Sequence, residues 1–227
     1  MNKKKILGVV LLIAGVLLIS MPYLTIRSLN SNSQQGVDYF NKLNAEDILK
    51  NNREVVEDEN FNFESVEEIS PMRVLLDPSK INPKLIVGQI TIKSIDLDLT
   101  VFKGVSETNL LAGAGTMKPS QIMGEGNYAV AGHNSRKGAL FYKLDQAKIN
   151  DIIKITDKEN IYEYKIYDRK IVSPTALYMI ENAEADKRGG PIISLMNCYY
   201  ENGKNTGNRY FVLGDLVNIY DYDESKM

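Results

Sequence analysis

The chain has very few residues of the kinds that form disulfides and metal sites. Its 227 residues include one cysteine, one histidine and no tryptophan. One cysteine excludes a disulfide within the chain, and a zinc site would need more cysteine and histidine ligands. The formal net charge of −2 argues against nucleic acid as a partner, because such proteins present strongly basic surfaces. Any thiol chemistry must therefore use one Cys–His pair, Cys198 and His133.

Charged residues are also missing from a long stretch near the N-terminus. Three lysines at positions 3 to 5 precede an uncharged run of 21 residues, Ile6 to Ile26. About 20 apolar residues cross the hydrocarbon core of a bilayer as a helix. No small-residue cleavage site of the signal-peptide kind follows the run. We therefore predict that residues 1–26 are an uncleaved signal-anchor that contacts membrane lipid.

The same lysines predict the orientation of the anchor. Positively charged residues stay on the cytoplasmic side of a membrane. The expected protein is a single-pass protein of the cell membrane, with its N-terminus in the cytoplasm and the rest of the chain outside. A lone exported thiol is exposed to oxidation, so its presence favours use in chemistry.

Beyond the anchor we expect two further segments. Residues 27–80 read as an extracellular stalk or linker: "RSLNSNSQQG" is typical of a flexible spacer, and "AEDILKNNREVV" predicts a possible short helix. Residues 81–227 read as the folded domain, with alternating, β-branched segments such as "LIVGQITIKSIDLDLTVFKG" and "NRYFVLGDLVNIY". Many short strands separated by turn signals predict an all-β fold, an antiparallel barrel or sandwich with short helices.

Three residues stand at predicted strand ends. Cys198 follows the apolar run "PIISLM", His133 follows "YAVAG", and Arg209 opens the last strand, eleven residues after Cys198. Catalytic groups usually lie at such junctions. A nearby imidazole or cation favours the reactive thiolate, and acyl transfer needs a donor for its oxyanion. Position alone leaves open a buried structural cysteine and a surface arginine.

The motifs together resemble those of the sortases, cysteine transpeptidases on the outer face of Gram-positive membranes. They are the signal-anchor, "AGHN" with His133, "SLMNC" with Cys198 and "RYFVLGDL" with Arg209. The similarity covers roughly residues 60–218 and is greatest to class A. Several motifs in order are far more specific than any one of them.

The resemblance implies a closed eight-stranded antiparallel β-barrel of the sortase type and a defined chemistry. Cys198 would attack the Thr–Gly bond of an LPXTG-type sorting signal on a surface protein and form a thioester. His133 would act as general acid and base, and Arg209 would bind the signal and stabilise the oxyanion. The acceptor would be the amine of a peptidoglycan precursor such as lipid II.

The chain departs from the family pattern T-L-x-T-C at two positions. Ser194 replaces the first Thr and keeps its hydroxyl, and Asn197 replaces the Thr before the cysteine. The resemblance implies that both positions adjoin the substrate, as does Ala131 of "AGHN". The change at Asn197 is therefore expected to affect signal preference and rate.

The long loop at residues 171–191 helps to recognise the sorting signal in the family. Its apolar residues either line a pocket for the Leu-Pro part of the signal or cap the barrel: Pro174, Ala176, Leu177 and Ile180. Some class A sortases bind calcium through acidic loops. The acids available here are better read as surface residues, so neither a metal nor a cofactor is expected: Glu107, Glu125, Glu181, Glu184 and Asp186.

Three alternatives to the transpeptidase remain. A thiol hydrolase would use the same residues and pass the acyl group to water. A non-catalytic, membrane-tethered β-domain that binds wall peptides would need Cys198 only as a buried residue. A pilin-polymerising sortase is disfavoured, because those usually carry a second, C-terminal anchor and the tail "NIYDYDESKM" is polar.

Overall fold

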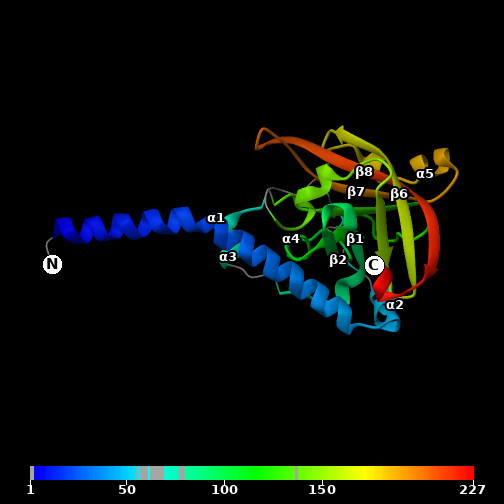
Figure 1. Ribbon diagram of the computed structural model, residues 1–227, viewed down its shortest axis with the longest axis horizontal. Helices are drawn as coiled ribbons and strands as arrows, with labels where there is room; N and C mark the ends of the chain where they lie inside the picture. The colour runs from blue at the N-terminus through cyan, green and yellow to red at the C-terminus, as the bar shows by residue number, and fades with distance from the viewer. Residues whose placement is uncertain (1–2, 55, 57–60, 62–68, 77–79, 136–137) are drawn as a thin grey trace.

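The computed structural model describes residues 3–54, 56, 61, 69–76, 80–135 and 138–227. Eight strands form a closed barrel in the order β1-β2-β3-β4-β7-β8-β6-β5 (Figure 1). The strands are β1 (Ile86–Ile92), β2 (Leu97–Phe102), β3 (Ala114–Thr116), β4 (Asn127–Gly132), β5 (Ile152–Thr156), β6 (Asn160–Val172), β7 (Ile192–Glu201) and β8 (Lys204–Asp221). The closed eight-stranded barrel expected from the sequence is confirmed.

The helices are short except for the first. The α-helices are α1 (Lys3–Lys42), α2 (Ala45–Arg53), α3 (Pro71–Leu76), α4 (Glu107–Leu110) and α5 (Ala183–Arg188). The 3-10 helices are η3 (Pro83–Leu85), η4 (Lys93–Ile95), η5 (Phe141–Gln146), η6 (Leu177–Met179) and η7 (Glu224–Lys226).

The strand directions correct one part of the expectation. Most neighbouring strands are antiparallel, but β2 runs parallel to β3 and β4 runs parallel to β7. The barrel is therefore mixed rather than wholly antiparallel. The β4–β7 pair matters for function, because the carboxyl ends of parallel strands lie at the same edge of a sheet.

Alternation along the strands separates two apolar clusters. Successive side chains of a strand point to opposite faces. One face fills the barrel interior with residues from every strand: Ile90, Leu99, Ala114, Val130, Ile153, Tyr164, Leu195 and Val212. The opposite face of β4, β7 and β8 carries a second cluster, which includes residues of the β6–β7 connection: Ala129, Ala131, Met196, Phe211, Leu213, Ala176 and Met179. We call this second set the outer cluster.

Helix α1 is a single helix of 40 residues with two environments. Its apolar first half projects away from the barrel and is exposed (Figure 1). It is long and apolar enough to cross a membrane, with a mean hydropathy of 2.5 over its most apolar window. The second half packs against the protein through one stripe of buried residues: Thr25, Leu29, Asn32, Gly36 and Phe40.

The prediction of a flexible spacer at residues 27–36 is wrong, because this segment is helical and partly buried. Gly36 allows the close approach: a Cβ there would lie 3.1 Å from the carbonyl oxygen of Ala112 and from Thr100 Oγ1. Phe40 is fully buried and belongs to one cluster with Ile86 and Phe102. The short helix expected further on is α2. The division into segments 1–26, 27–80 and 81–227 stays a prediction. Residues of α1 in the second segment pack against residues of the third.

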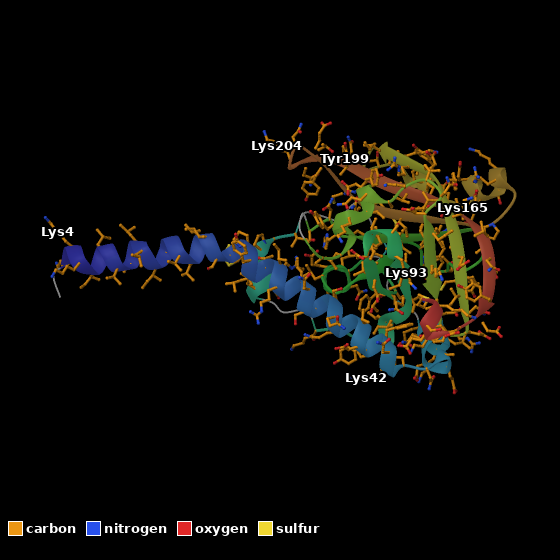
Figure 2. The ribbon with its side chains drawn as sticks, viewed as in Figure 1. Lys4, Lys42, Lys93, Lys165, Tyr199 and Lys204 are labelled. Carbon is orange, nitrogen blue, oxygen red and sulfur yellow. The ribbon has the colours of Figure 1, made fainter. Side chains whose placement is uncertain are left out.

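The sequence predicts Cys198 at the end of a strand, but the strand continues past it. β7 continues to Glu201 and β8 begins at Lys204. The turn consists of Asn202 and Gly203, both with positive φ, which is the backbone that two-residue hairpins require. The tip of this hairpin at Lys204 lies at the end of the barrel that faces the projecting half of α1, as does Tyr199 (Figure 2).

Candidate active site

The parallel pairing of β4 and β7 brings the two reactive side chains to one edge of the barrel. The ladder pairs Ala131 with Met196 and ends there. His133 and Cys198 each follow two residues later, so they leave the ladder at the same level and on the same face. A hydrogen bond supports this placement: Asn134 Nδ2 donates to the carbonyl oxygen of Cys198 over 3.3 Å. The expected meeting of Cys198 and His133 is therefore a feature of the strand register.

Arg209 reaches the site from the neighbouring strand. The antiparallel β7–β8 ladder pairs Cys198 directly with Arg209. Both side chains lie on the outer face, since the next pair on that face, Met196 and Phe211, belongs to the outer cluster. Arg209 is 6% exposed, and its Nη1 donates to the carbonyl oxygen of Gly207. It is therefore a buried cation beside the thiol and not a surface arginine.

Two effects act on the pKa of Cys198 in opposite directions. The thiol is 2% exposed, and burial raises its pKa because a thiolate loses solvation there. The positive charge of Arg209 lowers the pKa of Cys198 in turn, but burial is the larger effect. The resting thiol is thus held mainly in its neutral form, with a cation placed where a negative charge would develop.

His133 has a carboxylate partner that the sequence analysis treated as a surface acid. The side chain of His133 is 1% exposed, and its Nε2 lies 3.3 Å from Oε2 of Glu107, at the start of α4. The hydrogen bond with His133 lowers the pKa of Glu107, so this carboxyl stays ionised over the working range. Glu107 precedes His133 by 26 residues, and nothing in the sequence marked the contact.

Two residues expected to touch the substrate lie elsewhere. Ser194 is fully buried in β7, and its hydroxyl donates to Asn127 Oδ1 over 2.8 Å. It also lies 3.3 Å from the carbonyl oxygen of Met179, so it holds the β6–β7 connection to the barrel. The side chain of Asn197 points to the interior and donates from Nδ2 to the carbonyl oxygen of Phe141 over 2.9 Å. These expected substrate contacts are replaced by structural ones, because Ser194 is fully buried and the side chain of Asn197 faces away from Cys198.

The β6–β7 connection packs on the face that carries Cys198. Ala131 and Ala176 are buried together in the outer cluster, with Ile180 partly buried against it. Leu177 is 50% exposed, and Pro174 is of intermediate exposure. Ala176 therefore serves as a cap on the barrel, whereas Leu177 keeps apolar surface open to solvent.

A thiol, an imidazole and a guanidinium at one edge of a closed β-barrel define a class of protein. A thiol can act as a nucleophile, an imidazole can carry a proton, and a guanidinium can donate hydrogen bonds to an oxyanion. This set fits an enzyme that transfers acyl groups through a thioester.

The comparisons with known proteins agree with that class. The model of the sortase domain matches residues 90–217. Sortase A of Listeria monocytogenes is 36% identical over 94% of this chain and 91% of its own length. Sortase A of Bacillus anthracis is 34% identical over 96% of this chain and 97% of its own length. The chain belongs to the sortase family of cysteine transpeptidases, and these relatives support class A.

Solved structures support the same fold. The crystal structure of Listeria monocytogenes sortase A covers 62% of this chain and 93% of its own chain, with 35% identity and a TM-score of 0.54. A sortase C-1 from Streptococcus pneumoniae covers 84% of this chain and all of its own, with a TM-score of 0.58. At 20% identity, this second likeness concerns the fold alone.

Proposed function

We propose that this sortase joins surface proteins carrying an LPXTG-type sorting signal to an amine of a peptidoglycan precursor. In this proposal Cys198 is the nucleophile, His133 the general acid and base, and Arg209 the oxyanion donor. The observation that carries it is the direct pairing of Cys198 with Arg209 at the edge where β4 delivers His133.

The first half-reaction makes a thioester. His133 takes the proton of the Cys198 thiol as the sulfur attacks the carbonyl carbon of the signal's Thr, and the oxyanion that forms accepts hydrogen bonds from Arg209. A guanidinium suits this task because it stays charged and offers several donors. His133 gives a proton to the departing glycine nitrogen as the C–N bond breaks, which leaves the acyl group on sulfur.

The second half-reaction transfers the acyl group. The acceptor amine attacks the thioester carbon, His133 takes the proton that the amine loses, and the C–S bond breaks. The sulfur receives that proton from His133, so Cys198 returns to its resting thiol, and a new amide joins the protein to the precursor. In both steps Glu107 orients the imidazole and stabilises its protonated form, because an ionised carboxylate strengthens the hydrogen bond.

The β6–β7 connection supplies the specificity in this proposal. Pro174, Leu177 and Ile180 keep surface that is at least partly exposed near the outer cluster, so they would contact the Leu-Pro part of the signal. Ala131 and Ala176 lie beneath them as buried support. The projecting half of α1 would anchor the enzyme in the membrane with its three lysines in the cytoplasm and the barrel outside.

The test uses the full-length protein in detergent micelles with an LPXTG peptide and a glycine or diamine acceptor. Mass spectrometry of the products should find a peptide–amine adduct that is absent with Cys198→Ala. Cleaved peptide without adduct, with the acceptor saturating, would favour a hydrolase. Peptide binding without turnover, and a thiol that resists alkylation, would instead favour a non-catalytic domain.

A further inference from the structure

Asn197 has a specific partner in a place where polar groups are rare. Its side chain lies in the barrel interior and is 1% exposed. An amide buried among apolar side chains is costly unless it is hydrogen-bonded. Its Nδ2 meets the carbonyl oxygen of Phe141 at 2.9 Å, and Phe141 itself is fully buried. This bond therefore fixes the start of η5 against β7.

The bond to Phe141 is one part of a closed circuit. The backbone N–H of Phe141 donates to the carbonyl oxygen of His133 over 3.0 Å. The next residue, Asn134, donates from Nδ2 to the carbonyl oxygen of Cys198 over 3.3 Å. Cys198 follows Asn197 in the chain, so the circuit returns to its starting point. Three hydrogen bonds and two peptide links join the backbones of the nucleophile and the base.

The circuit lies where the sheet itself stops holding these residues together. The β4–β7 ladder ends at Ala131 and Met196, two residues before His133 and Cys198. Beyond that point, two side-chain amides take the place of backbone pairing. Reacting groups must keep their relative positions closely, since a displacement of about 1 Å can cost about 100-fold in rate.

We propose that Asn197 and Asn134 are positioning residues that hold His133 in register with Cys198. The inference rests on the proposed function, because it assigns these two residues a task in the same site. Neither asparagine touches the substrate in this role. An asparagine at position 197 suits the task, because its amide reaches further from the backbone than the hydroxyl of Thr.

The chain offers a sharp test because it has one histidine and one cysteine. In NMR spectra of the full-length protein, the imidazole of His133 is a single reporter. The change in the chemical shifts of its ring protons when Cys198 is blocked by a small neutral disulfide reagent reports how closely the two residues are held, and we call it the coupling between them. The variants are Asn197→Leu, which keeps the size but loses the donor, and Asn134→Ala. The matched control is Asn218→Ala, an exposed asparagine of β8.

The expected result has two parts. In Asn197→Leu and Asn134→Ala the coupling falls clearly, and kcat for adduct formation falls about tenfold or more with KM for the peptide nearly unchanged. Asn218→Ala matches the wild type. The double variant loses less than the product of the single losses, because either change opens the same circuit. Asn197→Thr restores little, because its hydroxyl falls short of the Phe141 carbonyl.

Two results would overturn the inference. One is unchanged coupling and unchanged kcat in both variants. The other is a raised KM or altered signal preference with the coupling intact, which would make Asn197 a substrate contact. If Asn197→Leu fails to fold by circular dichroism, Asn134→Ala decides the matter. Absence of adduct with the wild type would count against the proposed function, whereas the NMR coupling is measured without any substrate.

Discussion

Cys198 and Arg209 are direct partners across the β7–β8 ladder. Their separation is set by strand register, so no loop has to close for the cation to meet the thiol. A slip of one residue in this ladder would turn one of the two side chains into the barrel. The short turn at Asn202 and Gly203 closes this hairpin, and a register shift in the ladder separates the turn from the Cys198–Arg209 pair.

The charge of Arg209 should be visible in the reactivity of the thiol. Arg209→Met removes the effect that lowers the pKa of Cys198, so that pKa rises further above its ordinary value. Alkylation of Cys198 by iodoacetamide, measured against pH, should then move to higher pH. Arg209→Lys should leave that curve near the wild type but reduce turnover, because one ammonium cannot replace the planar fork. A curve for Arg209→Met that superimposes on the wild type would contradict the assignment.

Glu107→Gln tests the carboxylate beside His133. The amide keeps the size of the side chain but loses the charge that favours a protonated imidazole. Turnover should fall about tenfold, since hydrogen bonds to charged groups contribute roughly 1.5–3 kcal/mol. Glu125→Gln, on a neighbouring exposed turn, serves as the control.

Gly132→Ala tests the packing just before the base. A Cβ at Gly132 would lie 2.7 Å from the ring of Phe141, which is fully buried and cannot swing away. We expect a loss of about 1–3 kcal/mol in the free energy of unfolding, as for other overpacked cores. The fall in kcat should exceed that of Gly190→Ala, where an added Cβ meets nothing within 4 Å. Equal stability and turnover in the two variants would show that β4 can shift freely.

Phe40→Ala tests whether the second half of α1 belongs to the folded body. Phe40 is fully buried in one cluster with Ile48, Ile86 and Phe102, and removal of its ring should cost about 3–5 kcal/mol. Tyr39 on the same helix is exposed, so Tyr39→Ala should change stability little. Urea unfolding followed by tyrosine fluorescence gives both values. Similar midpoints for the two variants would show that the second half of α1 is a stalk that does not stabilise the folded domain.

The strands of the barrel follow from local signals in the sequence, whereas the roles proposed for Cys198, His133 and Arg209 come from the family resemblance. Alternating β-branched segments predict strands, and the order of His133, Cys198 and Arg209 predicts the neighbours. The same alternation could have corrected one expectation. Adjacent residues of a strand face opposite ways, so Asn197 and Cys198 cannot both face a substrate.

Other features depend on contacts between distant parts of the chain. The buried stripe of α1 mixes Thr25, Asn32 and Gly36 with apolar residues, so it lacks the hydrophobic period that predicts a packed helix. The parallel pairing of β4 with β7 joins segments some 65 residues apart. The contact of Glu107 with His133 likewise arises only when the barrel closes.

The unbroken course of α1 has a consequence for where the enzyme works. The helix continues through Pro22 from its apolar half to the buried stripe and changes direction between the two halves (Figure 1), and at the junction Ile26 approaches within 3.6 Å of a Cβ placed on Gly138. Each residue of a helix adds about 1.5 Å of length and about 100° of rotation. With the apolar half held in a membrane, one residue inserted near Tyr23 would therefore rotate the catalytic edge by about 100° around the helix axis. About seven inserted residues would restore the original orientation of the catalytic edge and move it roughly 10 Å further along the helix axis. The distance of the active site from the membrane and its rotation about the helix axis would thus both depend on the number of residues in α1.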